Sequence, residues 1–178
     1  HPELAVASAS IGKWHLGWTA ETGGDSAPNA FGWDHYAGPL KGTVESYSHW
    51  QRTEDGRTAW SDDYVTSAQV DDALAWLDER AEDESWLLWV AFVAPHTPYH
   101  VPPADLHSAG DLSPEAQAIG ADPRTYQQAV IEAMDTELGR LLQGMEARGM
   151  GETDILFLGD NGTEASAVQP PRDRRRAK

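Results

Sequence analysis

A chain of 178 residues is long enough for one domain with a proper core, and its 40% of hydrophobic residues is ordinary for a globular domain. The formal net charge of −16 excludes a general nucleic-acid binder, because phosphate backbones need a basic surface. The absence of cysteine excludes disulfides, thiolate metal sites and cysteine nucleophiles within this chain. An anionic substrate therefore has to be drawn in by a local cationic pocket.

The first half of the chain predicts one strand, a long irregular region and one helix. The strand covers Ala5 to Ile11 and leads into the glycine-flanked loop GKWHLG. The region from Thr19 to Asp63 has little periodicity, which is typical of a functional rim or of short irregular strands. A helix follows, with Ser61 or Asp62 as its cap and apolar side chains at helical spacing between Val65 and Leu77.

The second half predicts strand, helix and strand. Trp86 to Val93 is continuously apolar, as expected for a strand buried on both faces of a parallel sheet. A helix begins after its cap, Asp122, and ends before Gly149. Ile155 to Leu158 reads as a further buried strand. This alternation predicts an α/β fold, a mostly parallel sheet flanked by helices, in which ligands bind beyond the carboxyl ends of the strands. The longest apolar run has nine residues, so no transmembrane segment is predicted.

Three short polar segments each follow one of the predicted strands. Lys13 and His15 follow the first strand, His96 follows the second, and Asp160 and Asn161 follow the third. Taken singly, the lysine could be a solvated loop residue, each histidine a structural hydrogen-bonding group, and GDNG a plain turn. If the strands are parallel neighbours, however, all three segments converge on one edge of the sheet.

The side chains in these segments indicate a site for an oxyanion ester. Asp160 and Asn161 offer oxygen ligands, which favour calcium or magnesium, although calcium takes six to eight oxygens and needs more than two residues. Lys13, His15 and His96 supply positive charge and hydrogen-bond donors to an oxygen that develops negative charge. A sulfate or a phosphate ester fits this combination.

The same segments resemble the sulfatases of the alkaline phosphatase superfamily, over nearly the whole chain. IGKWHLG is similar to the lysine–histidine motif of that family, FGWDHYAG to its Gly-Phe-Asp segment, and FVAPHTPYHVP to its histidine loop. YQQAVIEAMDTELGRLL is similar to the helix before the metal strand, and DILFLGDNG to the strand that ends in the Asp-Asn metal pair. The order and spacing of these motifs make the resemblance specific.

The resemblance implies roles for individual residues. The implied catalytic residues are Lys13, His15, His96 and Lys178. Lys13, His96 and Lys178 would also bind the substrate, while His15 would contact the nucleophile and transfer its protons. Asp160 and Asn161 would be two of the ligands of a calcium ion, with magnesium as the alternative. The implied substrate is a small-molecule or carbohydrate sulfate ester.

The chain departs from the family pattern at both ends. The strand ending in paired metal-binding aspartates and the C/S-x-P/A-x-R motif that yields the formylglycine nucleophile are not found, and neither is the C-terminal subdomain. Residues 1–178 therefore resemble the central part of a sulfatase catalytic domain. In the full-length parent the implied reaction is transesterification onto formylglycine followed by elimination of sulfate. Without the nucleophile, we expect the 178-residue chain by itself to have little or no activity.

Two alternatives stay open at this point. One is a phosphonate or phosphodiester hydrolase of the same superfamily, and the other is a truncated, non-catalytic binding protein. The family suggests a periplasmic or secreted enzyme, but no signal peptide is visible and neither compartment nor oligomeric state can be assigned. His100, four residues after His96, is expected at the rim or the surface, with contact to the substrate as the alternative.

Overall fold

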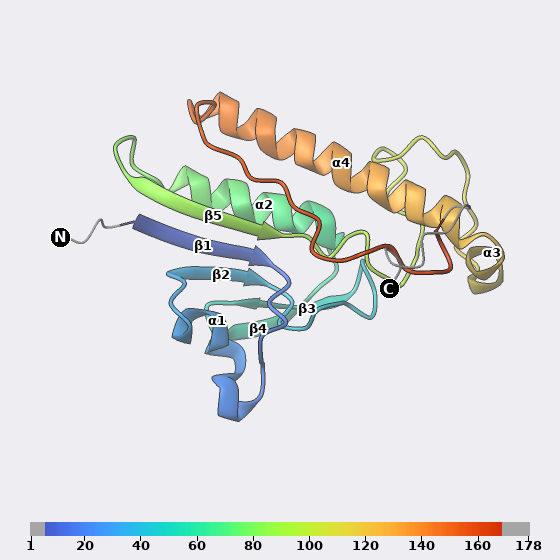
Figure 1. Cartoon of the computed structure of the whole chain (residues 1–178), viewed down its shortest axis with the longest axis horizontal. Helices are drawn as coiled ribbons and strands as arrows, with labels where there is room; N and C mark the ends of the chain where they lie inside the picture. Colours follow the sequence, from blue (N-terminus) through green and yellow to red (C-terminus); the bar gives the residue numbers. More distant parts are fainter. Residues whose placement is uncertain (1–5, 169–178) are drawn as a thin grey trace.

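The computed structural model describes residues 6–168 and folds them around a five-stranded sheet (Figure 1). The strands are β1 (Val6–Gly12), β2 (His35–Gly38), β3 (Trp50–Glu54), β4 (Arg57–Ser61) and β5 (Ser85–Ala91). The α-helices are α1 (Ala27–Ala30), α2 (Val65–Asp78), α3 (Ala116–Ala121) and α4 (Pro123–Ala147). Two 3-10 turns, η1 (Ala20–Thr22) and η2 (Gly24–Ser26), precede α1. None of the described helices combines the length and the apolar character needed to cross a bilayer.

The sheet is mixed, with spatial order β4-β3-β2-β1-β5. Its parallel part consists of β1 flanked by β2 and β5, and its antiparallel part consists of β2, β3 and β4. The expected α/β fold with helices flanking the sheet is therefore confirmed. The region that lacked periodicity, 19–63, supplies the three short strands β2, β3 and β4, because tight turns between strands of four or five residues leave no long repeat to detect.

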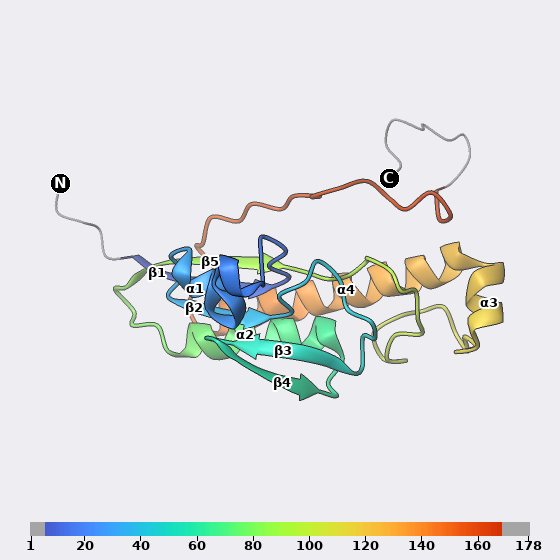
Figure 2. The ribbon, with the colours of Figure 1, turned by 90° about the horizontal axis from the view of Figure 1, so that it is seen from below.

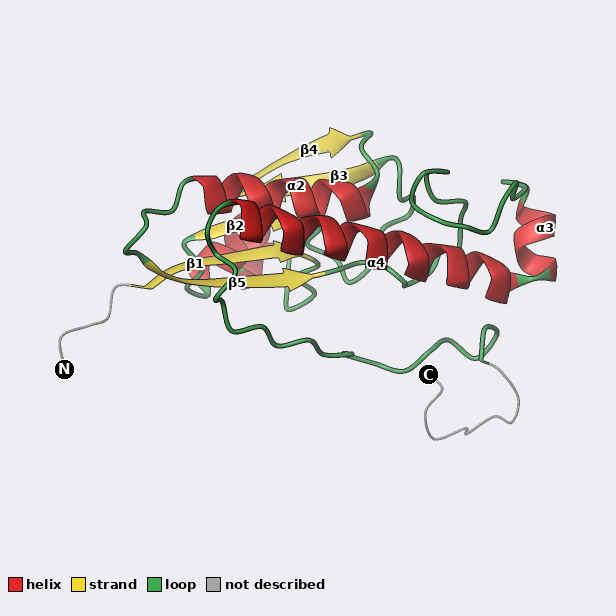
Figure 3. Cartoon of the chain, turned by 90° about the horizontal axis from the view of Figure 1, so that it is seen from above, coloured by secondary structure: helices red, strands yellow, loops and turns green. Residues whose placement is uncertain are grey.

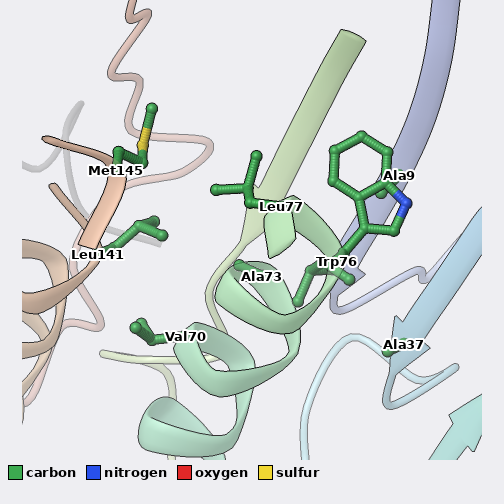
Figure 4. Packing of buried hydrophobic residues seen from close by; sticks show 9 residues of the cluster. Ala9, Ala37, Val70, Ala73, Trp76, Leu77, Leu141 and Met145 are labelled. Atoms are coloured by element: carbon green, nitrogen blue, oxygen red, sulfur yellow. The ribbon is translucent and has the colours of Figure 1, made fainter. Parts of the chain in front are cut away.

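α2 and α4 lie side by side over one face of the sheet (Figures 1 and 3). The core between them is built from α2 side chains such as Val70 and Leu77, which are 0% and 1% exposed, and from Leu141 of α4 (Figure 4). On the sheet side, small residues such as Ala9 and Ala37 let α2 approach closely. Each large aliphatic side chain buried here contributes about 2 kcal/mol of hydrophobic stabilisation.

The residue that caps the start of α4 was predicted correctly from the sequence, whereas the predicted cap of α2 was not. Asp122 caps α4 as expected, since its side chain accepts a hydrogen bond from the Thr125 amide at 3.4 Å, and Gly149, at φ 74°, follows the helix end. The predicted cap of α2 at Ser61 or Asp62 is wrong. α2 begins at Val65 without a side-chain cap, because the Val65 amide donates to the carbonyl of Tyr47 at 2.8 Å instead.

The prediction of a third buried strand at Ile155–Leu158 is also wrong for the described structure. This segment forms no strand, and its side chains are 59% (Ile155), 91% (Leu156), 70% (Phe157) and 71% (Leu158) exposed. Figure 2 shows the segment running apart from the sheet. A β-strand requires a neighbour for its backbone groups, and within residues 6–168 no strand lies along it. The segment is apolar, as a buried strand requires, but no strand of residues 6–168 pairs with it through backbone hydrogen bonds.

Candidate functional site

The carboxyl ends of β1 and β5 lie in register at one edge of the sheet, with Gly12 opposite Ala91. A Cβ atom on Gly12 would lie 2.1 Å from the carbonyl oxygen of Ala91, and Gly12 has φ 108°, so only glycine allows this close end. The Lys13 amide then donates to the same carbonyl at 2.9 Å. Lys13 and the loop that carries His96 therefore leave the sheet from neighbouring strands.

A buried glutamine of α2 fixes the chain as it leaves β5. Gln69 is 0% exposed; its Nε2 donates to the Ala91 carbonyl at 3.2 Å, and its Oε1 accepts from the Val93 amide at 3.3 Å. A buried polar group is stable only when its hydrogen bonds are satisfied, and Gln69 meets that need with the backbone of the candidate site. Gln69 was not identified from the sequence, although a glutamine on the apolar face of a helix was a usable signal.

Lys13 and Asp160 bring the first and the third polar segments together. The Nζ atom of Lys13 lies 2.5 Å from Oδ2 of Asp160, and the two side chains are 20% and 61% exposed. Asn161, the other predicted metal ligand, is exposed. The convergence expected from the sequence is therefore present for Lys13 and Asp160, even though Asp160 is reached by an extended segment rather than by a sheet strand.

His15 lies on the exposed loop after Lys13. Its backbone has φ 58°, its amide donates to the carbonyl of Leu40 at 3.0 Å, and its ring stacks on Trp18 at a centroid distance of 6.2 Å. Gly42 leaves room for this ring, since a Cβ atom there would lie 2.3 Å from Nδ1 of His15. Among residues 6–168, no hydrogen bond or ion pair connects His15 to the Lys13–Asp160 pair.

His96 is half-buried in the loop that follows β5. Its amide donates to the carbonyl of Val93 at 3.0 Å, and its Nδ1 lies 2.8 Å from the carbonyl oxygen of Thr97. Because a carbonyl can only accept, Nδ1 carries a proton, and the other ring nitrogen, Nε2, makes no hydrogen bond with the described residues. Tyr47 donates to the carbonyl of His96 at 2.7 Å, a contact that nothing in the sequence signalled.

The described residues do not by themselves fit a calcium ion. They contain no group of three or more acidic, histidine or cysteine side chains placed to share a metal. Asp160 and Asn161 together fall short of the six to eight oxygens that calcium takes, and the Asp160 carboxylate is paired with Lys13. Lys178, the predicted second active-site lysine, lies outside the described residues.

Comparisons with known proteins show the family to which the chain belongs. The family model described as Sulfatase matches residues 5–176. An arylsulfatase of Klebsiella aerogenes is 29% identical over 203 residues, covering 85% of this chain and 43% of the relative. A "Ulvan-active sulfatase" of Formosa agariphila is 26% identical, covering 87% of this chain and 32% of the relative. The chain thus spans less than half the length of these relatives.

Solved structures share the fold. The structure of Ps i-CgsB in complex with k-i-k-neocarrahexaose superposes with a TM-score of 0.63 at 21% identity, covering 82% of this chain and 34% of that one. A second structure, in complex with its substrate D-glucosamine-2-N,6-O-disulfate, superposes with a TM-score of 0.56 at 17% identity, covering 83% and 45%. The alkaline phosphatase-like fold expected from the motifs is therefore confirmed. With the family model matching almost all of its length, the chain belongs to the sulfatase family.

Proposed function

We propose that the full-length protein hydrolyses the sulfate monoester of a small molecule or a carbohydrate. The observation that carries this proposal is the position of Lys13, His96 and Asp160 around the carboxyl ends of β1 and β5. A cationic side chain and an imidazole that donates from Nε2 when it is charged, both at one edge of a sheet, are suited to an anion that gains charge on oxygen during ester cleavage. The ulvan-active relative and the neighbour that holds neocarrahexaose support a carbohydrate as the alcohol part.

Each candidate residue has a proposed role, and the geometry described above bears on those of Lys13 and His96. Lys13 would donate from Nζ to a sulfate oxygen, at the position where Asp160 now accepts. His96 would present Nε2 to the leaving-group oxygen and protonate it when the ring is charged. His15, exposed on its loop, would hold a proton next to the nucleophile, and Lys178 would be a second cation at the substrate. These roles use only side chains of this chain and require no metal-dependent step.

We further propose that residues 1–178 are the central part of the catalytic domain. The formylglycine nucleophile and most ligands of a calcium or magnesium ion would then come from other parts of the polypeptide, with Asp160 and Asn161 adding two ligands. The lengths of the relatives support this view, since each is more than twice as long as the matched part.

The outer side of β5 gives independent support for a larger domain. Within residues 6–168, β5 pairs only with β1, so its other edge carries unpaired backbone groups. Leu87 and Trp89 of β5 are 53% and 50% exposed, and the apolar segment Ile155–Leu158 is exposed as well. Exposed apolar strand edges are uncommon in complete domains. An additional strand beside β5 would pair with these backbone groups, and further chain packed on the sheet face opposite α2 would cover Leu87 and Trp89.

Turnover measurements on two proteins test the proposal. We expect the full-length protein to hydrolyse an aryl sulfate much faster than an aryl phosphate diester, and we expect the purified 178-residue chain to hydrolyse neither. Faster turnover of the phosphate diester would instead assign the protein to the phosphodiester hydrolases of the superfamily. Clear aryl sulfate hydrolysis by the 178-residue chain would contradict the placement of the nucleophile outside it.

A further inference from the structure

Three consecutive carbonyls of the loop after β5 each accept a hydrogen bond from a side chain. The carbonyl of His96 accepts from the Tyr47 hydroxyl at 2.7 Å, and the carbonyl of Thr97 accepts from the Thr43 hydroxyl at 2.7 Å. The carbonyl of Pro98 accepts from Nδ1 of His100 at 3.0 Å. Loops normally leave such carbonyls to water, whereas here a side-chain hydrogen bond fixes each of three successive peptide units.

Tyr47 and His100 form a stacked pair beneath the loop. Their ring centroids are 3.9 Å apart and the rings are 25° from parallel, while Tyr47 is only 3% exposed. Both nitrogens of His100 are occupied, because Nδ1 donates to Pro98 and Nε2 lies 3.1 Å from the hydroxyl of Tyr64. With the proton on Nδ1, a neutral His100 accepts at Nε2 from the Tyr64 hydroxyl. Burial also lowers the pKa of His100, which favours the same neutral form.

This arrangement acts on His96 through the backbone. The Thr97 carbonyl accepts both from the Thr43 hydroxyl and from Nδ1 of His96. Because Thr43 holds this carbonyl in place, the carbonyl favours the tautomer of His96 that has its proton on Nδ1. The preceding carbonyl, that of His96 itself, is fixed by Tyr47. The two peptide units that follow the His96 side chain, 96–97 and 97–98, therefore have set orientations, and the ring is bonded to the second of them. Both hydrogen-bond contacts of the His96 ring within residues 6–168 are made by Nδ1, to the carbonyl oxygen and the hydroxyl of Thr97, so Nε2 is left for the substrate.

We infer that the Tyr47–His100 pair is a positioning device that keeps the His96 proton on Nδ1 and presents Nε2 to the substrate. Tyr47 and His100 touch no reacting atom in this role; they act through the loop backbone and through His96. The part of the inference that concerns substrate rests on the proposed function. The part that concerns the tautomer of His96 does not, and it can be measured on the 178-residue chain.

The tautomer is tested by long-range proton–nitrogen NMR correlations of the histidine rings. In the wild-type chain we expect His96 to be mainly the Nδ1–H tautomer. In Tyr47→Phe, which keeps the ring stack but loses the hydroxyl, we expect the Nε2–H tautomer to rise about fivefold, as loss of one ordinary hydrogen bond allows. Tyr126→Phe is the matched control, because it removes a tyrosine hydroxyl bound to the Ser113 carbonyl at 2.8 Å, at the start of α4. Its His96 spectrum should equal the wild type.

Two outcomes overturn the inference: a wild-type His96 that is mainly Nε2–H, or a Tyr47→Phe spectrum identical to that of Tyr126→Phe. Variants of His100 separate positioning from general folding. His100→Ala should disturb the tautomer ratio as Tyr47→Phe does, and His100→Phe should restore it, because a phenyl ring keeps the stack on Tyr47. An equal disturbance in both His100 variants would show that stacking is not what holds Tyr47.

The full-length enzyme gives a second readout. There we expect Tyr47→Phe to lower kcat about tenfold with KM within about twofold, since binding groups stay in place and only the orientation of His96 changes. If the wild-type enzyme hydrolyses no sulfate ester, the proposed function fails while the tautomer result stands. If it hydrolyses the ester and Tyr47→Phe matches the wild type, the positioning role fails alone.

Discussion

The Nζ atom of Lys13 and the Oδ2 atom of Asp160 lie 2.5 Å apart, although 147 positions of sequence separate the two residues. The pair joins the loop after β1 to an extended segment that has no strand beside it among residues 6–168. It also means that the cation proposed to bind sulfate is held ready at the edge of the sheet by a carboxylate that the resemblance assigns to a metal. A sulfate ester or a metal ion entering this site has to exchange for one member of the pair.

Substituting Lys13 by Ala should affect turnover far more than folding. Lys13 is partly exposed, so the loss of its ion pair should change the free energy of unfolding by about 1 kcal/mol or less. Loss of a donor to developing oxyanion charge typically lowers kcat by about 10²–10³-fold. Steady-state kinetics of the full-length variant, together with urea unfolding, checks both expectations. A variant with wild-type turnover would remove Lys13 from the proposed site.

Gly42→Ala should disturb His15 without unfolding the chain. The new methyl group would meet Nδ1 of His15 at 2.3 Å, so the exposed imidazole has to move away from its stack on Trp18. We expect a change in unfolding free energy within about 0.5 kcal/mol and a loss of turnover in the full-length enzyme. Gly120→Ala is the control, because nothing lies within 4 Å of a Cβ atom there. Unchanged turnover in Gly42→Ala would show that the position of His15 is unimportant.

The burial of His100 predicts a specific loss of stability in acid. Burial lowers the pKa of His100 from its ordinary 6.5, with the Pro98 carbonyl opposing part of the effect. The unfolded chain therefore binds this proton more readily, and the free energy of unfolding should fall as the pH drops from about 6.5 towards the lower folded pKa. Tyr47 and Tyr64, which face His100, stay neutral in this range because burial raises the pKa of both.

Comparison with His100→Phe isolates this contribution. Chemical unfolding at pH 7.5, 6.5 and 5.5 should give a shallower pH dependence for the variant than for the wild type, by up to about 1.4 kcal/mol per pH unit. Loss of the hydrogen bonds to Tyr64 and Pro98 should lower the stability of the variant at every pH, so only the slopes are compared. Identical slopes would mean that His100 titrates normally in the folded chain.

Calcium should bind the full-length protein and leave the 178-residue chain nearly unaffected. The described residues offer Asp160 and Asn161 without further clustered carboxylates, and two ligands are too few for tight binding. Calorimetric titration of the 178-residue chain should therefore show no saturable binding at micromolar calcium, whereas a chelator should abolish turnover of the full-length enzyme. Micromolar affinity in the short chain would reveal ligands among residues outside 6–168.

The elements that the sequence predicted well are those whose signals are local. The cap of α4 at Asp122 and the apolar stripe of α2 depend on neighbours within one or two turns, and both are present in the structure. The strand predicted at Ile155–Leu158 depends on a partner strand, which no local pattern can supply. The same apolar run therefore describes a buried strand or an exposed segment, according to what lies beside it.

The residues of the candidate site also differ in whether the sequence carries a local signal for them. Lys13, His96 and Asp160 were found because they lie next to glycines and prolines at the ends of apolar runs, and this signal can be read from the sequence without the structure. Tyr47 and Thr43 were missed, since they reach the His96 loop from more than 45 residues away along the chain and lie in a region without periodicity. His100 was expected at the rim and is instead half-buried against Tyr47.

The uncovered edge of β5 also bears on how the short chain behaves in a test tube. Within residues 6–168, the amides and carbonyls on the outer edge of β5 have no strand partner and are a template on which another copy can pair, so the isolated chain should self-associate as its concentration rises. The net charge of −16 opposes this association at low ionic strength, and added salt weakens that protection. Purification in dilute, low-salt buffer should therefore yield the most monodisperse material.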